Sequence, residues 1–134
     1  MDYFEIIGKK QLNGIVKISG AKNAVLPVMA ASILNDSPLK LNNVPTLSDS
    51  RTMASILESM GSKVVFINNN SINIDNSSLD NPFASYDLVR TMRASFYVLG
   101  PLLARFRKAK VSLPGGCAWG PRPVDFHIKA FEKL

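Results

Sequence analysis

The apolar positions of this chain fall into short clusters and two long runs. Residues 3–7 and 15–19 are short clusters rich in aromatic and β-branched side chains, and turn residues lie between them, which predicts two short strands. The run from Ala24 to Leu34 is apolar at almost every position, and residues 92–106 repeat this pattern, each with one internal proline. A helix that is apolar all round is buried on every side. The sequence therefore predicts two fully buried helices.

The polar positions mark the other elements. Ser48-Asp49-Ser50 is a capping sequence before an amphipathic helix at residues 51–60, which Gly61 closes. The asparagines at 68–70 predict the turn of a hairpin. The remaining expected elements are strands at 39–41, 63–67, 71–74 and 110–113, a polar loop at 75–82, and a final helix that Pro123 opens. This mixture predicts an α/β (α+β) fold.

Composition narrows the class of protein. A length of 134 residues fits one domain, and 46% hydrophobic with 19% charged residues indicates a globular chain rather than a disordered or collagen-like one. One cysteine excludes an internal disulfide, and with one histidine it is too few for a cysteine-based zinc site. We expect no metal and no cofactor. The first residues carry acids, and the longest apolar run is about half of the ~20 residues that cross a bilayer, so we expect no membrane partner and a cytoplasmic protein.

The charge balance favours anionic partners, because 16 basic and 10 acidic residues give a net charge of +6. Lys22, Arg93 and Arg122 fall at the starts of predicted helices. A helix N-terminus already carries partial positive charge, so a cation there costs a few tenths of a kcal/mol or more. We expect a phosphate or carboxylate to offset that cost. The alternative is that the helix boundaries differ by one turn and the placement is coincidental.

Cys117 is the candidate catalytic residue. A lone cysteine is most often a small buried hydrophobe. Here Gly115-Gly116 lets the backbone approach a ligand closely, and Arg122 is five residues away. A thiol with an ordinary pKa of ~8.5 is mostly protonated at neutral pH, so it can donate a proton. The neighbouring aromatic residues Trp119 and Phe126 are expected to pack rather than to stack on a nucleobase.

Four motifs follow one another along essentially the whole chain: Ser19-Gly20-Ala21-Lys22-Asn23-Ala24-Val25-Leu26-Pro27, Thr91-Met92-Arg93-Ala94-Ser95, Ser112-Leu113-Pro114-Gly115-Gly116-Cys117 and Gly120-Pro121-Arg122-Pro123-Val124-Asp125. In this order they resemble the N-terminal part of the enolpyruvyl transferase family, and within it the members that act on UDP-N-acetylglucosamine. Each motif alone is weak, but the four together are specific. Trp119 departs from the aliphatic residue expected there, and Phe126 stands where leucine is common.

The resemblance implies a fold of two similar lobes, each an inside-out α/β barrel in which small sheets surround buried helices. Residues 1–20 would be a strand pair belonging to the other lobe, and residues 21–134 the first, truncated part of the catalytic lobe. Because family members are much longer and the last predicted helix is still in progress at Leu134, the C-terminal lobe is expected beyond this chain.

The implied reaction moves the enolpyruvyl group of phosphoenolpyruvate to the 3′-hydroxyl of UDP-N-acetylglucosamine and releases phosphate, the first committed step of peptidoglycan synthesis. By resemblance, Cys117 protonates the methylene carbon, can form an adduct with phosphoenolpyruvate, and is alkylated by fosfomycin. The implied substrate-binding residues are Lys22, Asn23, Arg93, Arg122, Pro123, Val124, Asp125 and Phe126. The family's aspartate base would lie beyond Leu134, so the 134 residues alone are not expected to turn over.

Three other interpretations of the sequence compete with the UDP-N-acetylglucosamine enolpyruvyl transferase. A shikimate-pathway enolpyruvyl transferase normally carries Lys-Ser rather than Lys22-Asn23 and lacks the Pro-Gly-Gly-Cys loop. A nucleic-acid-binding module would explain the net charge, but the basic residues form no single stripe and do not interleave with aromatic residues. An inert structural fragment is the third reading.

Overall fold

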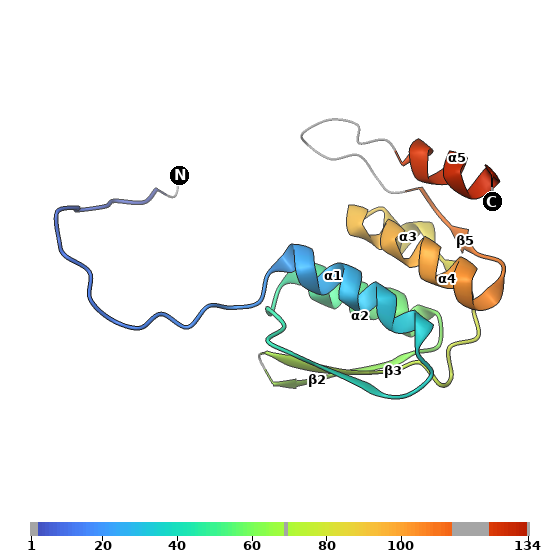
Figure 1. Cartoon of the computed structure of the whole chain (residues 1–134), viewed down its shortest axis with the longest axis horizontal. Coiled ribbons are helices and arrows are strands. Elements are labelled where there is room, and N and C mark those ends of the chain that lie inside the picture. The colour runs from blue at the N-terminus through green and yellow to red at the C-terminus, as the bar shows by residue number, and fades with distance from the viewer. Residues whose placement is uncertain (1–2, 69, 114–123, 134) are drawn as a thin grey trace.

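The computed structural model describes residues 3–68, 70–113 and 124–133, which form helices and two small sheets (Figure 1). In chain order the elements are α1 (Lys22–Ala31), the 3₁₀ helix η1 (Ser32–Leu34), β1 (Leu39–Asn42), α2 (Ser48–Ser59), β2 (Lys63–Asn68), β3 (Ser71–Asp75), β4 (Phe83–Ala84), α3 (Tyr86–Val89), the 3₁₀ helix η2 (Arg93–Val98), α4 (Leu99–Phe106), β5 (Lys110–Val111) and α5 (Asp125–Lys133). The predicted mixed α/β class is confirmed.

The larger sheet has the order β1-β3-β2 and is antiparallel throughout. Ile72 and Ile74 of β3 are fully buried and Asn73 between them is exposed, because successive side chains of a strand point to opposite faces. Helices α1 and α2 lie over this sheet (Figure 1). The predicted hairpin is confirmed as β2 and β3. The sequence pattern did not reveal β4, which pairs in parallel with β5.

The two apolar runs form helices, but neither is buried on all sides. In α1, Leu26 and Met29 are buried, whereas Val28 is 46% exposed. The second run is divided into η2 and α4, and Leu102 is the buried residue of α4. The prediction of burial on every side is therefore wrong for the described chain. Apolar composition shows that a helix face can be buried, but a neighbouring element decides whether it is.

Residues 3–19 do not form the predicted strand pair. The chain there contains no strand and runs away from the helices and sheets (Figure 1). Its apolar side chains are exposed; Phe4, for example, is 98% exposed. A strand is stable only when a partner pairs with its backbone groups, and a local pattern does not specify that partner. The assignment of residues 1–20 to another lobe stays a prediction.

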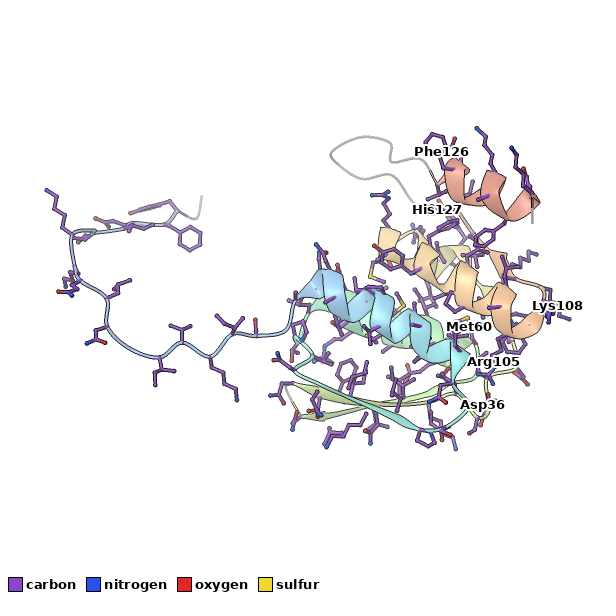
Figure 2. The ribbon with its side chains drawn as sticks, in the orientation of Figure 1. Asp36, Met60, Arg105, Lys108, Phe126 and His127 are labelled. Carbon is purple, nitrogen blue, oxygen red and sulfur yellow. The ribbon has the colours of Figure 1, made fainter. Side chains whose placement is uncertain are left out.

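A buried polar cluster joins η1, the residue that follows β3, and α4. Asn76, which is fully buried, donates from Nδ2 to the carbonyl of Ser32 at 2.7 Å and accepts from the hydroxyl of Ser62 at 2.6 Å. Arg105 of α4 donates to the carbonyls of Ile33 at 2.8 Å and Asn76 at 3.1 Å. Because buried polar groups are costly without partners, this cluster fixes the end of α4 against η1 (Figure 2).

The described residues contain neither a membrane-spanning helix nor a metal-binding cluster. None of their helices is long and apolar enough to cross a membrane. The same residues contain no group of three or more His, Cys, Asp or Glu side chains placed to hold a metal ion.

Candidate functional site

Helix α1 and the helix formed by η2 and α4 lie side by side and run in the same direction (Figure 1). The first parts of the two helices, α1 and η2, are in contact, and so are their last parts, η1 and α4. The hydrogen bond from Arg105 to the carbonyl of Ile33 joins their C-terminal ends. The N-terminal ends of both helices therefore lie at the same end of the molecule, opposite Arg105.

Helix α5 has the same direction. The rings of Phe96 in η2 and His127 in α5 are 6.5 Å apart between centroids. Four residues further along each helix, a methyl group placed on Gly100 would lie 4.0 Å from Cζ of Phe131. Because the contacts advance together along both helices, α5 runs parallel to α4. Its first residue, Asp125, consequently lies towards the end at which η2 begins.

The starts of α1, η2 and α5 lie at one end of the molecule, which we call the shared end. Three of the predicted site residues lie at helix starts there. Lys22 and Asn23 are the first residues of α1, and Arg93 is the first residue of η2. The residues that precede these helices, Ala21 and Met92, make no side-chain capping hydrogen bond. Uncapped N–H groups and cationic side chains add their positive charge at the same end. The structure thus places Lys22, Asn23 and Arg93 at the starts of two helices that contact each other, and their role in binding an anion stays a prediction.

The start of α1 is held against the loop after β1. The backbone N–H of Gly20 donates to Oδ1 of Asn43 at 3.1 Å. A Cβ atom at position 20 would lie 1.8 Å from the carbonyl oxygen of Asn43, so only glycine fits there. This close approach places Lys22 next to the loop that leads into α2.

Asp49 is a residue of this end that sequence reasoning treated only as part of a helix cap. Its Oδ2 lies 3.0 Å from Nζ of Lys22. Helix α2 begins at Ser48, and Leu47 precedes it, so the prediction that residues 48–50 cap a helix starting at residue 51 is wrong. The signal available in the sequence was an acid in the first turn of α2.

The start of α5 carries the other described site residues. The carbonyl of Val124, just before the helix, accepts from the N–H groups of His127 at 3.1 Å and Ile128 at 3.3 Å. Asp125 pairs with Lys129 through Oδ2 at 3.2 Å, while its Oδ1 is buried and accepts no hydrogen bond from the described part of the chain. Phe126 is 73% exposed, so the expectation that it packs is wrong in this structure (Figure 2).

Cys117, Arg122 and Pro123 lie outside the described residues, as does Trp119. Their predicted roles stay predictions. In the described part of the chain, a lysine and an arginine begin α1 and η2 at the same end of the molecule, and such a placement at helix N-termini favours an anion.

The fold and this cationic end define a partial lobe of an enolpyruvyl transferase. A family model described as EPSP synthase (3-phosphoshikimate 1-carboxyvinyltransferase) matches residues 6–134. The chain belongs to this family. The enolpyruvyl transferase NikO from Streptomyces tendae has a similar structure, with a TM-score of 0.63 and 25% identity over 74% of this chain and 23% of NikO.

The sequence relatives are more specific. Proteins named UDP-N-acetylglucosamine 1-carboxyvinyltransferase from Campylobacter hominis, Dichelobacter nodosus and Psychrobacter arcticus are 52%, 54% and 55% identical to this chain over all 134 residues. The resemblance predicted from the four motifs is confirmed. The chain spans 32% of the length of each of these relatives.

Proposed function

We propose that this protein transfers the enolpyruvyl group of phosphoenolpyruvate to the 3′-hydroxyl of UDP-N-acetylglucosamine and releases phosphate. The observation that carries the proposal is the shared end of α1, η2 and α5, where Lys22, Asn23 and Arg93 lie. Both substrates carry phosphate groups, and phosphoenolpyruvate also carries a carboxylate, so each needs cationic side chains and helix N–H groups. The relatives at 52–55% identity bear the name of this activity, which supports the choice of sugar nucleotide.

In this proposal the two substrates occupy neighbouring parts of the shared end. Lys22, Asn23 and Arg93 bind phosphate or carboxylate oxygens, since each supplies N–H donors. Arg122 binds phosphate oxygens from the segment before α5. Residues 122–126 bind the UDP-sugar. The order of the helices in the structure, with α5 against η2 and η2 against α1, supports this division.

Cys117 supplies the proton in the proposed mechanism. Its thiol protonates the methylene carbon of phosphoenolpyruvate, which leaves positive charge at C2. The 3′-hydroxyl of the sugar attacks C2 and loses its proton to a base. Loss of a proton from the new methyl group and departure of phosphate then form the vinyl ether. The side chains of Lys22, Arg93 and Arg122 stabilise these reaction steps, because negative charge accumulates on the leaving phosphate.

The proposal extends to the context of the reaction. The reaction commits UDP-N-acetylglucosamine to peptidoglycan synthesis, which links the protein to the cell wall and to cell shape and division. We propose that it takes place in the cytoplasm. Because the relatives are about three times as long as this chain, we propose that residues 1–134 alone do not turn over. The general base then belongs to the part of the relatives' length that these residues do not span.

3-Phosphoshikimate is the alternative acceptor, because the description of the matching family model names it. The relatives named for UDP-N-acetylglucosamine over the full 134 residues favour the sugar nucleotide. The two readings differ only in the acceptor.

The test measures phosphate release by the protein at the length its gene encodes, with phosphoenolpyruvate and each acceptor in turn. We expect turnover with UDP-N-acetylglucosamine and none with 3-phosphoshikimate. Cys117→Ser should sharply reduce turnover while the sugar nucleotide still binds. Lys22→Ala should raise the KM for phosphoenolpyruvate, whereas the matched control Lys40→Ala, an exposed lysine of β1, should not. Turnover with 3-phosphoshikimate alone would reverse the choice of acceptor.

A further inference from the structure

The ion pair between Lys22 and Asp49 joins the first turns of two helices, α1 and α2. The 3.0 Å separation of Nζ and Oδ2 is a hydrogen-bonding distance. The side chain of Lys22 is half exposed, and that of Asp49 is 30% exposed. An ammonium group has three donors, so Lys22 can donate to Asp49 and still present donors to a second anion.

Both charges sit where helix dipoles make the pairing useful. Lys22 is a cation at the N-terminus of α1, whose first turn contains no acidic residue, so its position is unfavourable within that helix. Asp49 is an acid in the first turn of α2, where it is favourable. The carboxylate therefore stabilises its own helix and offsets the cation on the neighbouring one.

The backbone around this pair is fixed from two directions. Gly20, two residues before Lys22, is bound to Asn43 through its N–H at 3.1 Å. The hydroxyl of Ser50, next to Asp49, donates to the carbonyl of Pro45 at 3.1 Å. The loop from Asn43 to Pro45 is therefore hydrogen-bonded to Gly20, near Lys22, and to Ser50, next to Asp49. With the backbone held in this way, the conformational freedom that remains is that of the long Lys22 side chain. The ion pair with Asp49 restricts that freedom.

We propose that Asp49 is a positioning residue for phosphoenolpyruvate: it holds the ammonium group of Lys22 at the shared helix end so that the remaining donors meet the substrate's phosphate. This inference rests on the proposed function. Asp49 does not touch the substrate in this arrangement and acts through Lys22. A flexible lysine loses side-chain entropy when it binds an anion, and a lysine held in place loses less.

The test compares Asp49→Asn with Asp36→Asn in the protein at its encoded length. Asp36 is a matched control, because it also pairs with a cation, Arg105, but at the opposite end of the helices (Figure 2). We expect Asp49→Asn to raise the KM for phosphoenolpyruvate about tenfold, which corresponds to ~1.4 kcal/mol. The KM for the acceptor and the melting temperature should stay close to those of the control.

A double-mutant cycle shows whether Asp49 acts through Lys22. In a Lys22→Ala protein, Asp49→Asn should change the KM for phosphoenolpyruvate by less than about twofold. An undiminished effect would overturn the proposal, and so would a lower KM in Asp49→Asn alone, since Asp49 would then compete with the phosphate. A parallel rise of both KM values with a lower melting temperature would show a merely structural role.

Binding of inorganic phosphate, followed by calorimetry, tests the same role without turnover. Asp49→Asn should weaken phosphate binding, and Asp36→Asn should not. If neither acceptor is converted but phosphate binding follows this pattern, the proposed function fails and the role of Asp49 in holding Lys22 stands. If an acceptor is converted and phosphate binding is unchanged in Asp49→Asn, the role of Asp49 fails alone.

Discussion

Gly20→Ala is the substitution whose effect follows most directly from the structure. The added Cβ would lie 1.8 Å from the carbonyl oxygen of Asn43, whereas real Cβ atoms essentially never approach a heavy atom within 3.0 Å. The two backbone segments must therefore move apart by more than 1 Å. We expect that movement to break the hydrogen bond from the Gly20 N–H to Oδ1 of Asn43, which is now 3.1 Å long.

The magnitude combines two costs. Overpacking against backbone costs about 1–3 kcal/mol, and a lost hydrogen bond costs about 1 kcal/mol. We expect Gly20→Ala to lower the free energy of unfolding by about 2–4 kcal/mol, a large part of the ~5–15 kcal/mol that stabilises a typical domain. Under the proposed function, the displaced start of α1 should also raise the KM for phosphoenolpyruvate, because it carries Lys22.

Urea unfolding followed by circular dichroism measures the change in free energy. The matched control is Gly8→Ala, because a Cβ on Gly8 meets no atom within 4 Å. The control should unfold within about 0.5 kcal/mol of the parent protein. If Gly20→Ala matched this control in both stability and KM, the close approach of residues 20 and 43 would not determine how α1 begins.

Three further predictions concern other parts of the chain. Asn76→Ala should lower the free energy of unfolding by about 1–3 kcal/mol, because it leaves buried hydrogen-bonding partners unsatisfied. In the same urea experiment, the control Asn73→Ala on the exposed face of β3 should have little effect, and equal effects of the two substitutions would contradict the role of the buried cluster. The backbone N–H of Ser77 donates to Asp75 and holds the pKa of that carboxyl below its usual value of 3.8. The stability that the ionised Asp75 contributes is therefore present above pH 3.8 and is lost as the pH falls through the lower pKa of the folded state. A carboxyl titration of Asp75 by NMR with a midpoint at or above 3.8 would refute this. Fosfomycin should add one adduct mass at Cys117 when UDP-N-acetylglucosamine is present, and mass spectrometry of active enzyme without that adduct would count against a substrate-facing thiol.

Local patterns in the sequence determined most of the secondary structure of residues 21–113. The helix at 48–59, the hairpin of β2 and β3, and the start of η2 at Arg93 all lie within a few residues of their predicted positions. These elements depend on side-chain periodicity and on turn residues, which are local properties. The motifs also indicated the family, because they occur in a specific order along one chain.

Only the tertiary structure decided which elements meet. It placed the starts of α1, η2 and α5 at one end, and it paired Lys22 with Asp49. It also left one side of α1 and the chain from residue 3 to 19 exposed, against the expectation from their apolar residues. An apolar residue indicates that burial is favourable, but the choice of neighbour depends on contacts between segments far apart in the sequence, which no local periodicity contains.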